Sequence, residues 1–162
     1  MGHSREFEEQ RRQMEMLRSH VERCLQDIWG VHDLVIDDDG DYPYRHGTAM
    51  CWVSLFGGPV PGVRVFANAA YGLKCSARLL REVNDLNGRS TWARVVLQDG
   101  VVRVSAELHW AAVDRLALEQ AAGAVASVAD DIGALLAAVY GGHTAFPVQE
   151  QGQDEPREGR AA

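Results

Sequence analysis

Two runs of alternating apolar residues flank Asp99-Gly100, and this arrangement restricts the fold more than any other feature of the chain. An Asp-Gly pair between such runs predicts a two-residue β-hairpin turn. In that hairpin, residues whose numbers sum to 199 face each other, so Val95 lies opposite Val104 and Leu97 opposite Val102. A slip of one residue would mix this apolar face with the polar one, so the sequence predicts a single register.

Apolar periodicity and chain breakers predict the remaining elements. Gly30, Gly88 and Gly141-Gly142 stand where three helices are expected to end, and Ser76 is a suitable N-cap. In chain order we expect a helix over 5–29, a short strand and a second extended piece within 34–47, strands over 48–56 and 63–69, a helix over 76–87, the hairpin, and a helix over 114–140.

The order α-β-β-β-α-β-β-α, without internal repeats, favours an α+β fold in which an antiparallel sheet carries its helices mainly on one face. We expect one domain over residues 1–143 and a disordered tail over 144–162, because the last residues lack apolar periodicity. The first half of the first helix is mostly charged and is free to project or to pack against a partner. The expected buried positions of the second and third helices are Leu79, Leu80, Val83, Leu86, Leu118, Ala122, Val125, Val128, Ala129, Ile132, Leu135, Leu136 and Val139.

Charge and cysteine usage limit the partners and the compartment. The formal net charge of −7 argues against binding to nucleic acid or to an anionic membrane, although residues 61–103 carry seven basic and three acidic residues. Cys24, Cys51 and Cys75 form no paired motif and are expected to be reduced packing residues. No signal peptide and no apolar run long enough to span a membrane is evident, so we expect a cytoplasmic protein.

Motifs for catalysis, metals and cofactors are not evident. Asp37, Asp39 and Asp41 alternate as in a calcium loop, but Tyr42 and Thr48 stand where that loop needs glycine and glutamate, so a solvated turn is the better interpretation. The glycines of "GGPVPG" precede neither a Lys-Ser/Thr pair nor a helix, and the six histidines lack metal-ligand spacing. We therefore expect no enzyme, no cofactor and no metal.

What remains is a sheet surface of aromatic and basic side chains. If the hairpin face with Val95 and Val104 packs on the helices, strand alternation gathers the opposite side chains into a candidate partner-binding surface. The alternative is that the first helix or a neighbouring loop covers these aromatics. The candidate residues are Met50, Trp52, Phe56, Arg64, Phe66, Trp92, Arg94 and Arg103.

Asn84 and Asn87 lie one helical turn apart at the end of the second predicted helix. Asparagine is well tolerated near helix C-termini, where its amide bonds local backbone groups. We favour that structural role over contact with a partner.

Several segments resemble the type III secretion chaperone-like superfamily, in particular the YbjN-like proteins and their actinobacterial relatives. The resemblance runs through "VRVFANA", "LLREVNDLN", "WARVVLQDGVVRVSAEL" and "LLAAVYGG", within residues 63–142. It implies the same element order, a homodimer and no catalysis. Secretion chaperones of this fold bind extended client segments through apolar patches, and YbjN-like proteins are described as sensory or stress-related regulators.

Together these features predict a cytoplasmic, dimeric module that binds a client protein or peptide on the aromatic and basic sheet surface. Arginines would orient an acidic and hydrophobic segment, and the aromatic residues would supply most of the affinity. The alternative is a sensory or stress regulator that acts through a protein partner, or a structural dimer in which the same surface is permanently buried.

Overall fold

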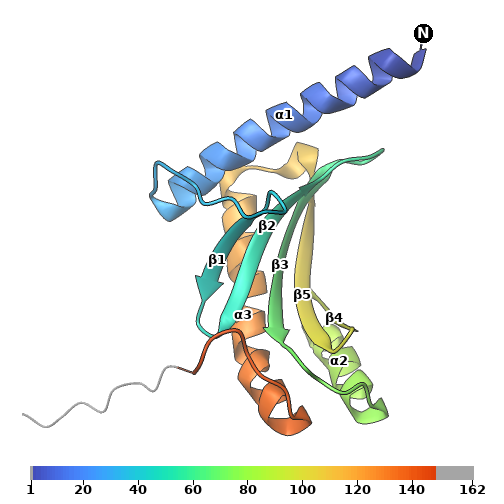
Figure 1. The fold of residues 1–162 in the computed structure, drawn as a ribbon, viewed down its shortest axis with the longest axis vertical. Coiled ribbons are helices and arrows are strands. Elements are labelled where there is room, and N and C mark those ends of the chain that lie inside the picture. Colours follow the sequence, from blue (N-terminus) through green and yellow to red (C-terminus); the bar gives the residue numbers. More distant parts are fainter. Residues whose placement is uncertain (1, 149–162) are drawn as a thin grey trace, which may run out of the picture.

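Five antiparallel strands form one sheet in the order β1-β2-β3-β5-β4, with the helices on one face and at one end (Figure 1). The structure, a computed structural model, describes residues 2–148. The elements are α1 (Gly2–Trp29), β1 (Tyr42–His46), β2 (Ala49–Phe56), β3 (Gly62–Ala70), α2 (Ala77–Arg89), β4 (Arg94–Gln98), β5 (Val101–His109), a 3₁₀ turn η1 (Trp110–Ala112) and α3 (Arg115–Tyr140). The predicted fold class and element order are confirmed.

The hairpin of β4 and β5 has the predicted register. Val95 pairs with Val104 and Leu97 pairs with Val102. Asp99 and Gly100 both have positive φ, 50° and 77°, which a two-residue type I′ turn requires. The turn sequence therefore sets which residues of the last two strands face the helices.

The first strand lies later in the chain than expected. Residues 34–37 form no strand, and β1 begins at Tyr42, in the segment predicted as a second extended piece. Pro43 is tolerated there because β1 is an edge strand. The acidic residues before it form a turn, in which Asp37 accepts backbone N–H bonds from Asp39 and Asp41 through its carboxylate, at 3.1 and 2.9 Å.

The long helix α3 packs on the sheet and forms the centre of the core. Asp114 caps its N-terminus and Gly141, at φ 76°, ends it. A Cβ on Gly133 would collide with the carbonyl oxygen of Ala69 on β3, so glycine allows the helix to approach the sheet closely. The buried residues of α3 are Leu118, Ala122, Val125, Ala126, Ala129, Gly133 and Leu136.

Two predicted core positions of α3 are wrong. Leu135 and Val139 are 61% and 47% exposed. The side of the helix that faces the sheet carries small residues, such as Ala126 and Gly133, and Leu135 and Val139 lie on other sides. By length and composition α3 could also cross a membrane, but this is weak evidence because a core helix passes the same test. Its buried side faces β3 and β5.

Helix α2 packs beside β4, the edge strand at the end of the sheet opposite β1. Ser76 caps it as predicted, whereas Gly88 lies inside the helix, which continues to Arg89. Leu80 is 48% exposed and does not belong to the predicted buried stripe. The Asn87 side chain accepts from the N–H of Val95 and donates to its carbonyl oxygen, at 2.8 and 2.7 Å.

Asn87 therefore has the structural role predicted for it, and a larger one. Its side-chain amide bonds the N–H and the carbonyl oxygen of Val95, the groups that a further strand would otherwise bond at this edge of the sheet. An edge so occupied is less able to pair with another chain.

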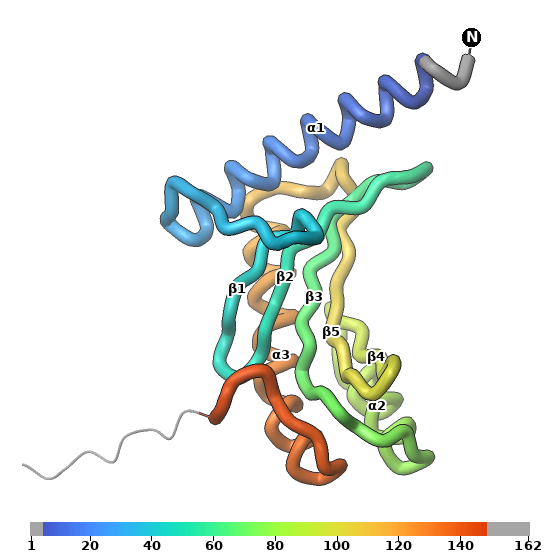
Figure 2. The backbone as a smooth tube through the Cα atoms, viewed as in Figure 1, coloured from blue at the N-terminus to red at the C-terminus, as the bar shows by residue number. Residues whose placement is uncertain are grey.

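Helix α1 runs across one end of the sheet, and its N-terminal half projects past the other elements (Figure 2). Val21 and Leu25 in the second half are fully buried, whereas Phe7 is 70% exposed. The hydroxyl of Tyr42 donates to Glu22 at 2.7 Å and accepts from Arg18 at 2.9 Å, which fastens α1 to β1. Burial and the bond to Glu22 raise the pKa of Tyr42 to about 12.

Residues 143–148 return to the sheet after α3. His143 pairs with Tyr71 through two backbone hydrogen bonds, and the N–H of Phe146 donates to the carbonyl of Thr48 at 3.2 Å. The expected tail over 144–162 thus begins with residues that make specific contacts, and residues 149–162 lie outside the described part.

The cysteines differ in environment. Cys24 and Cys51 are buried as predicted, and burial raises the pKa of each thiol, that of Cys51 to about 11. Cys75 is exposed, so the prediction that all three cysteines serve packing is wrong for Cys75.

Asp130 of α3 holds the turn between β1 and β2, and its replacement gives a test of the fold. Its carboxylate accepts from the N–H and the hydroxyl of Thr48, both at 2.7 Å, and these bonds lower the pKa of Asp130. Because the pKa of Asp130 is lower in the folded than in the unfolded protein, ionised Asp130 stabilises the fold at pH values above its unfolded-state pKa. This stabilisation is lost as the pH falls through the folded-state pKa of Asp130. We expect Asp130→Asn to cost about 1–2 kcal/mol near neutral pH.

Urea unfolding at a series of pH values measures this effect. The difference between wild type and Asp130→Asn should shrink as the pH falls below about 4, the usual carboxyl range. A difference that is constant from neutral to acidic pH would contradict the role given to the carboxylate.

Candidate functional site

The face of the sheet opposite α2 and α3 is the candidate site, and we call it the outer face. Strand registers align its side chains in rows that cross the strands. One row is Arg45, Met50, Asn68, Arg103 and Val96, the next is Pro43, Trp52, Phe66, Ser105 and Arg94, and a third is Ser54, Arg64 and Glu107.

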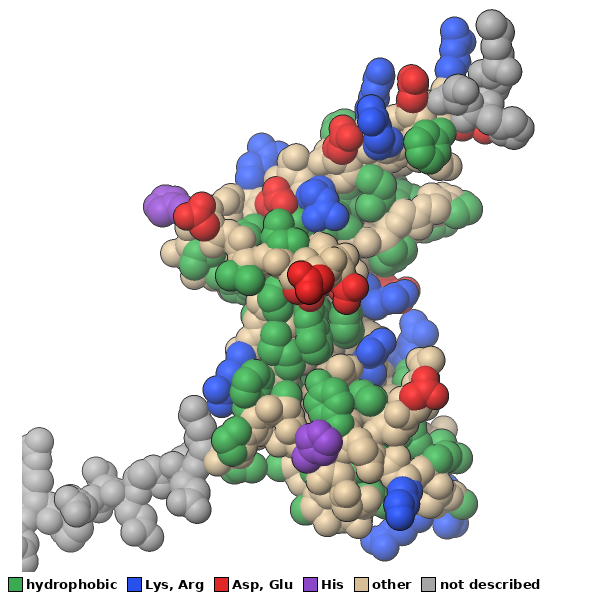
Figure 3. Space-filling model, in the orientation of Figure 1, with side chains coloured by type: hydrophobic (Ala, Val, Ile, Leu, Met, Phe, Trp, Pro, Cys, Tyr) green, Lys and Arg blue, Asp and Glu red, His purple; other side chains and the backbone are tan. Residues whose placement is uncertain are grey.

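Figure 3 shows this face, with hydrophobic side chains along its middle and basic side chains on both flanks, while most of its acidic side chains lie toward α1. The arrangement follows from alternation, because the intervening residues of each strand point into the core. Val53, Val65 and Val104 on the other side are fully buried.

An aromatic pair occupies the centre of the outer face. The rings of Trp52 and Phe66 stack with centroids 5.2 Å apart and planes 14° apart. The guanidinium of Arg103 lies 5.0 Å from the centre of the Phe66 ring, and its Nε donates to Asn68 at 3.1 Å. Both rings are only partly buried.

Arg64 and Phe56 form a second cluster toward α1. The guanidinium of Arg64 lies 5.6 Å from the centre of the Phe56 ring and forms an ion pair with Glu107 at 2.8 Å. Both partners of that pair are well exposed, so it contributes little stability and can exchange for another carboxylate.

The predicted residues of the hairpin are at the margin of this surface. Arg94 is exposed in the same row as Trp52 and Phe66. Trp92 is 80% exposed and lies in a bend before β4, outside the paired strand. The structure therefore brings seven of the eight predicted residues together on one sheet face and places Trp92 beside it in the chain.

Sequence reasoning missed Arg45 and Phe146 on this surface. The guanidinium of Arg45 lies 4.1 Å from the centre of the Phe146 ring, at the corner where β1 meets the C-terminal segment. Strand alternation could have placed Arg45 on this surface, because the neighbouring Tyr44 points to the opposite face, toward α3. No local pattern indicated Phe146, because its contact joins residues far apart in the chain.

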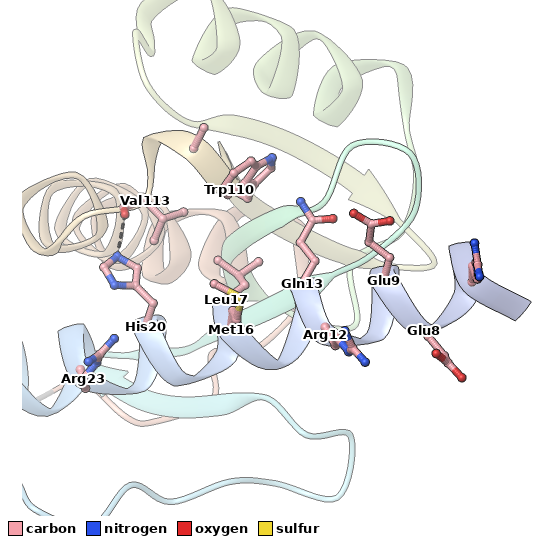
Figure 4. A pocket seen from close by; sticks show the side chains of 12 residues that line it. Glu8, Glu9, Arg12, Gln13, Met16, Leu17, His20, Arg23, Trp110 and Val113 are labelled. Carbon is pink, nitrogen blue, oxygen red and sulfur yellow. Dashed lines mark hydrogen bonds between the residues drawn. The ribbon is translucent and has the colours of Figure 1, made fainter.

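A hollow lies between the projecting half of α1 and η1, with a volume of about 950 Å³. In Figure 4, Gln13 and Glu9 of α1 extend on the same side as Trp110, while Glu8 points away. His20 closes the inner end, where its Nε2 lies 2.8 Å from the carbonyl oxygen of Val113. This hollow contains mixed charges and lacks the aromatic stack of the outer face.

The displaced pKa values belong to packing contacts. Burial raises the pKa of Tyr44, whose hydroxyl donates to the carbonyl of Ala122 at 3.1 Å. Among residues 2–148, no group of three or more histidine, cysteine or acidic side chains is placed to hold a metal ion. The polar contacts described here stabilise the fold, and the outer face offers stacking and charge for binding.

Comparisons with known proteins agree with this arrangement. The sequence model of the family "T3SS (YopN, CesT) and YbjN peptide-binding chaperone 1" matches residues 15–148. Among solved structures, the chain is similar to one in the "Crystal Structure of the ExsC-ExsE Complex", with a TM-score of 0.58 and 16% identity, covering 73% of this chain and 94% of that one. No curated protein matches.

The contact between Arg103 and Phe66 can be measured with a double-mutant cycle of Arg103→Ala and Phe66→Leu. Urea unfolding should give a coupling energy of about 0.5–1 kcal/mol, the usual size for an exposed cation–π contact. The matched control is Arg94→Ala with Phe66→Leu, for which the coupling should be near zero because β5 lies between the strands that carry these two residues. Equal coupling in both cycles would show that Arg103 does not lie over the ring.

Proposed function

The chain belongs to the family of T3SS (YopN, CesT) and YbjN peptide-binding chaperones, and from this membership we propose that it holds an extended client segment on the outer face. The proposed module acts in the cytoplasm and catalyses no reaction. The observation that carries the proposal is the partly exposed stack of Trp52 on Phe66 at the centre of a sheet face without a covering helix.

The aromatic stack supplies the anchor for an apolar client side chain. Tryptophan and other large aromatic residues dominate binding energy at protein interfaces, because they bury a large area with little loss of side-chain freedom. Trp52 and Phe66 are already ordered by their mutual stacking. Binding therefore costs little further ordering at this position.

The flanking arginines select the charge of the client. Four arginines, at 45, 64, 94 and 103, share the outer face with one acidic residue, Glu107, within the described strands. A client carboxylate would find a guanidinium on either side of the aromatic stack. Such charges set orientation and association rate more than affinity.

Strand spacing fixes the separation of these client features. Phe66 on β3 and Arg94 on β4 occupy one row, with β5 between them. Two strand spacings amount to about 10 Å, which an extended peptide covers in about three residues. The proposed client therefore carries an acidic residue about three positions from its apolar anchor.

We also propose that the protein forms a homodimer that leaves the outer face accessible. The competing regulatory alternative buries the same face permanently between two copies. Light scattering combined with carboxyl- and arginine-directed labelling separates the two, since Arg94 and Arg103 of an accessible face remain reactive in the purified dimer.

Selection from a random peptide library displayed on phage tests the client site. We expect the wild-type protein to enrich peptides with an apolar residue and an acidic residue about three positions apart. The double variant Trp52→Ala, Trp92→Ala should bind the selected peptides at least tenfold more weakly, because aromatic anchors carry most of an interface's energy.

The matched control is Trp110→Ala, which removes a partly exposed tryptophan at the α1 hollow. Far-ultraviolet circular dichroism verifies that each variant is folded. Loss of binding in Trp110→Ala together with retention in the double variant would move the client site to the hollow and reject the outer face.

A further inference from the structure

We propose that two copies of the chain pair through the projecting halves of their α1 helices, so that each half lies in the hollow between α1 and η1 of the other copy. This inference rests on the proposed function, because it names the surface through which the proposed homodimer forms. It is carried by three features: an exposed helical segment, a hollow of sufficient length beside it, and a pattern of charges that complements itself.

The projecting half of α1 is exposed to solvent. Residues 5–12 are all exposed, and the apolar side chains of Phe7 and Met16 are 70% and 74% exposed. By contrast, Val21 and Leu25 in the second half of the helix are fully buried. A helical segment of about twelve residues is only marginally stable in water unless it packs on something. The projecting half is therefore stabilised by a partner that covers it.

The hollow beside this half is long enough to take a helix. Residues of α1 from Arg5 to Arg23 line it, and η1 contributes Trp110 (Figure 4). At 1.5 Å per residue, that length of α1 measures about 27 Å, whereas the projecting half over 5–16 measures about 18 Å. The projecting half of a second copy therefore fits along the hollow, where Met16 and the 44% exposed Trp110 offer apolar contacts.

The charges along the hollow complement themselves. Helix positions three and four residues apart share a face, and the stripe of Arg5, Glu9, Arg12 and Met16 lines the hollow. If two copies lie antiparallel and cross between residues 10 and 11, Glu9 of each copy lies beside Arg12 of the other. A parallel pair would instead place Glu9 beside Glu9 and Arg12 beside Arg12. Both residues are exposed, and the ion pairs found within residues 2–148 do not engage them, so the charges favour the antiparallel pair.

An antiparallel pair of this kind has twofold symmetry and is compatible with the client site. Symmetry forms the contact between Glu9 and Arg12 twice and fills both hollows. The hollow lies at the α1 end of the sheet (Figure 1), so the pair leaves the stack of Trp52 on Phe66 uncovered. Pairing through the β4 edge is less favourable, because Asn87 already occupies backbone groups there.

Charge reversal in the full-length chain tests this interface, with sedimentation equilibrium as the measurement. We expect E9R and R12E each to weaken the dimer at least tenfold, because each places like charges together at both symmetric contacts. The double variant E9R/R12E restores opposite charges and should dimerise like the wild type. The matched control is R11E, which makes the same change of charge beside Arg12 but outside the lining of the hollow, and its dimer should match the wild type.

A mixture of the two single variants gives a second test. One copy then contributes two arginines to the contact and the other contributes two glutamates, so E9R and R12E should form a heterodimer although each alone is mainly a monomer. Far-ultraviolet circular dichroism verifies that each variant is folded. Dimers of E9R and R12E as stable as the wild-type dimer would overturn the proposal, because another surface would then join the copies.

A peptide titration separates this proposal from the client site itself. A fluorescent copy of one phage-selected peptide is titrated into the wild type and into R12E, and equal affinity for the monomeric R12E supports an interface apart from the client site. If R12E remains a dimer and binds the peptide, the inference fails while the client site stands. If R12E is a monomer but the wild type selects no peptide, the client site fails while the interface stands. A monomeric wild type whose peptide binding is lost in R12E would assign the hollow to the client and overturn the proposal.

Discussion

The close packing of α3 on one face of the sheet is the contact on which the other features depend. Gly133 lies so near Ala69 that no Cβ fits between them, and small residues such as Ala126 and Ala129 continue this contact surface. The helix therefore buries the apolar side chains that the central strands direct to that face. Because side chains alternate along a strand, the aromatic and basic residues are left together on the opposite face.

Polar contacts around this core fix the margins of the sheet. Asp130 holds the turn between β1 and β2, and Asn87 occupies backbone groups of Val95 at the β4 edge. The pair formed by Tyr42 and Glu22 attaches α1 to the first strand. These contacts order the margins of the sheet that carries the outer face, and a surface that is already ordered loses less entropy when it binds a partner.

Local sequence patterns predicted the parts of the structure that depend on neighbouring residues. The Asp99-Gly100 turn set the register of the last hairpin, and strand alternation then placed Phe66 and Arg103 on one face. Ser76 and Gly141 marked two helix ends correctly. The element order followed from these signals.

Features that depend on distant contacts could not be predicted. Apolar periodicity marks Leu80 and Leu135 as candidates for burial, but it does not say whether another element reaches them. The contact of Phe146 with Arg45 joins two segments about a hundred residues apart in the chain. The first strand was misplaced because Val35 and Ile36 are apolar yet have no neighbouring strand, whereas Tyr42 pairs with β2 despite the following proline.

The central claim is that the outer face binds an extended peptide, and the indole N–H signals of the four tryptophans test it most directly. A ¹H–¹⁵N titration with one selected peptide should shift the Trp52 signal and leave Trp110 at the α1 hollow unchanged. A shift of Trp110 with an unmoved Trp52 signal would contradict the account.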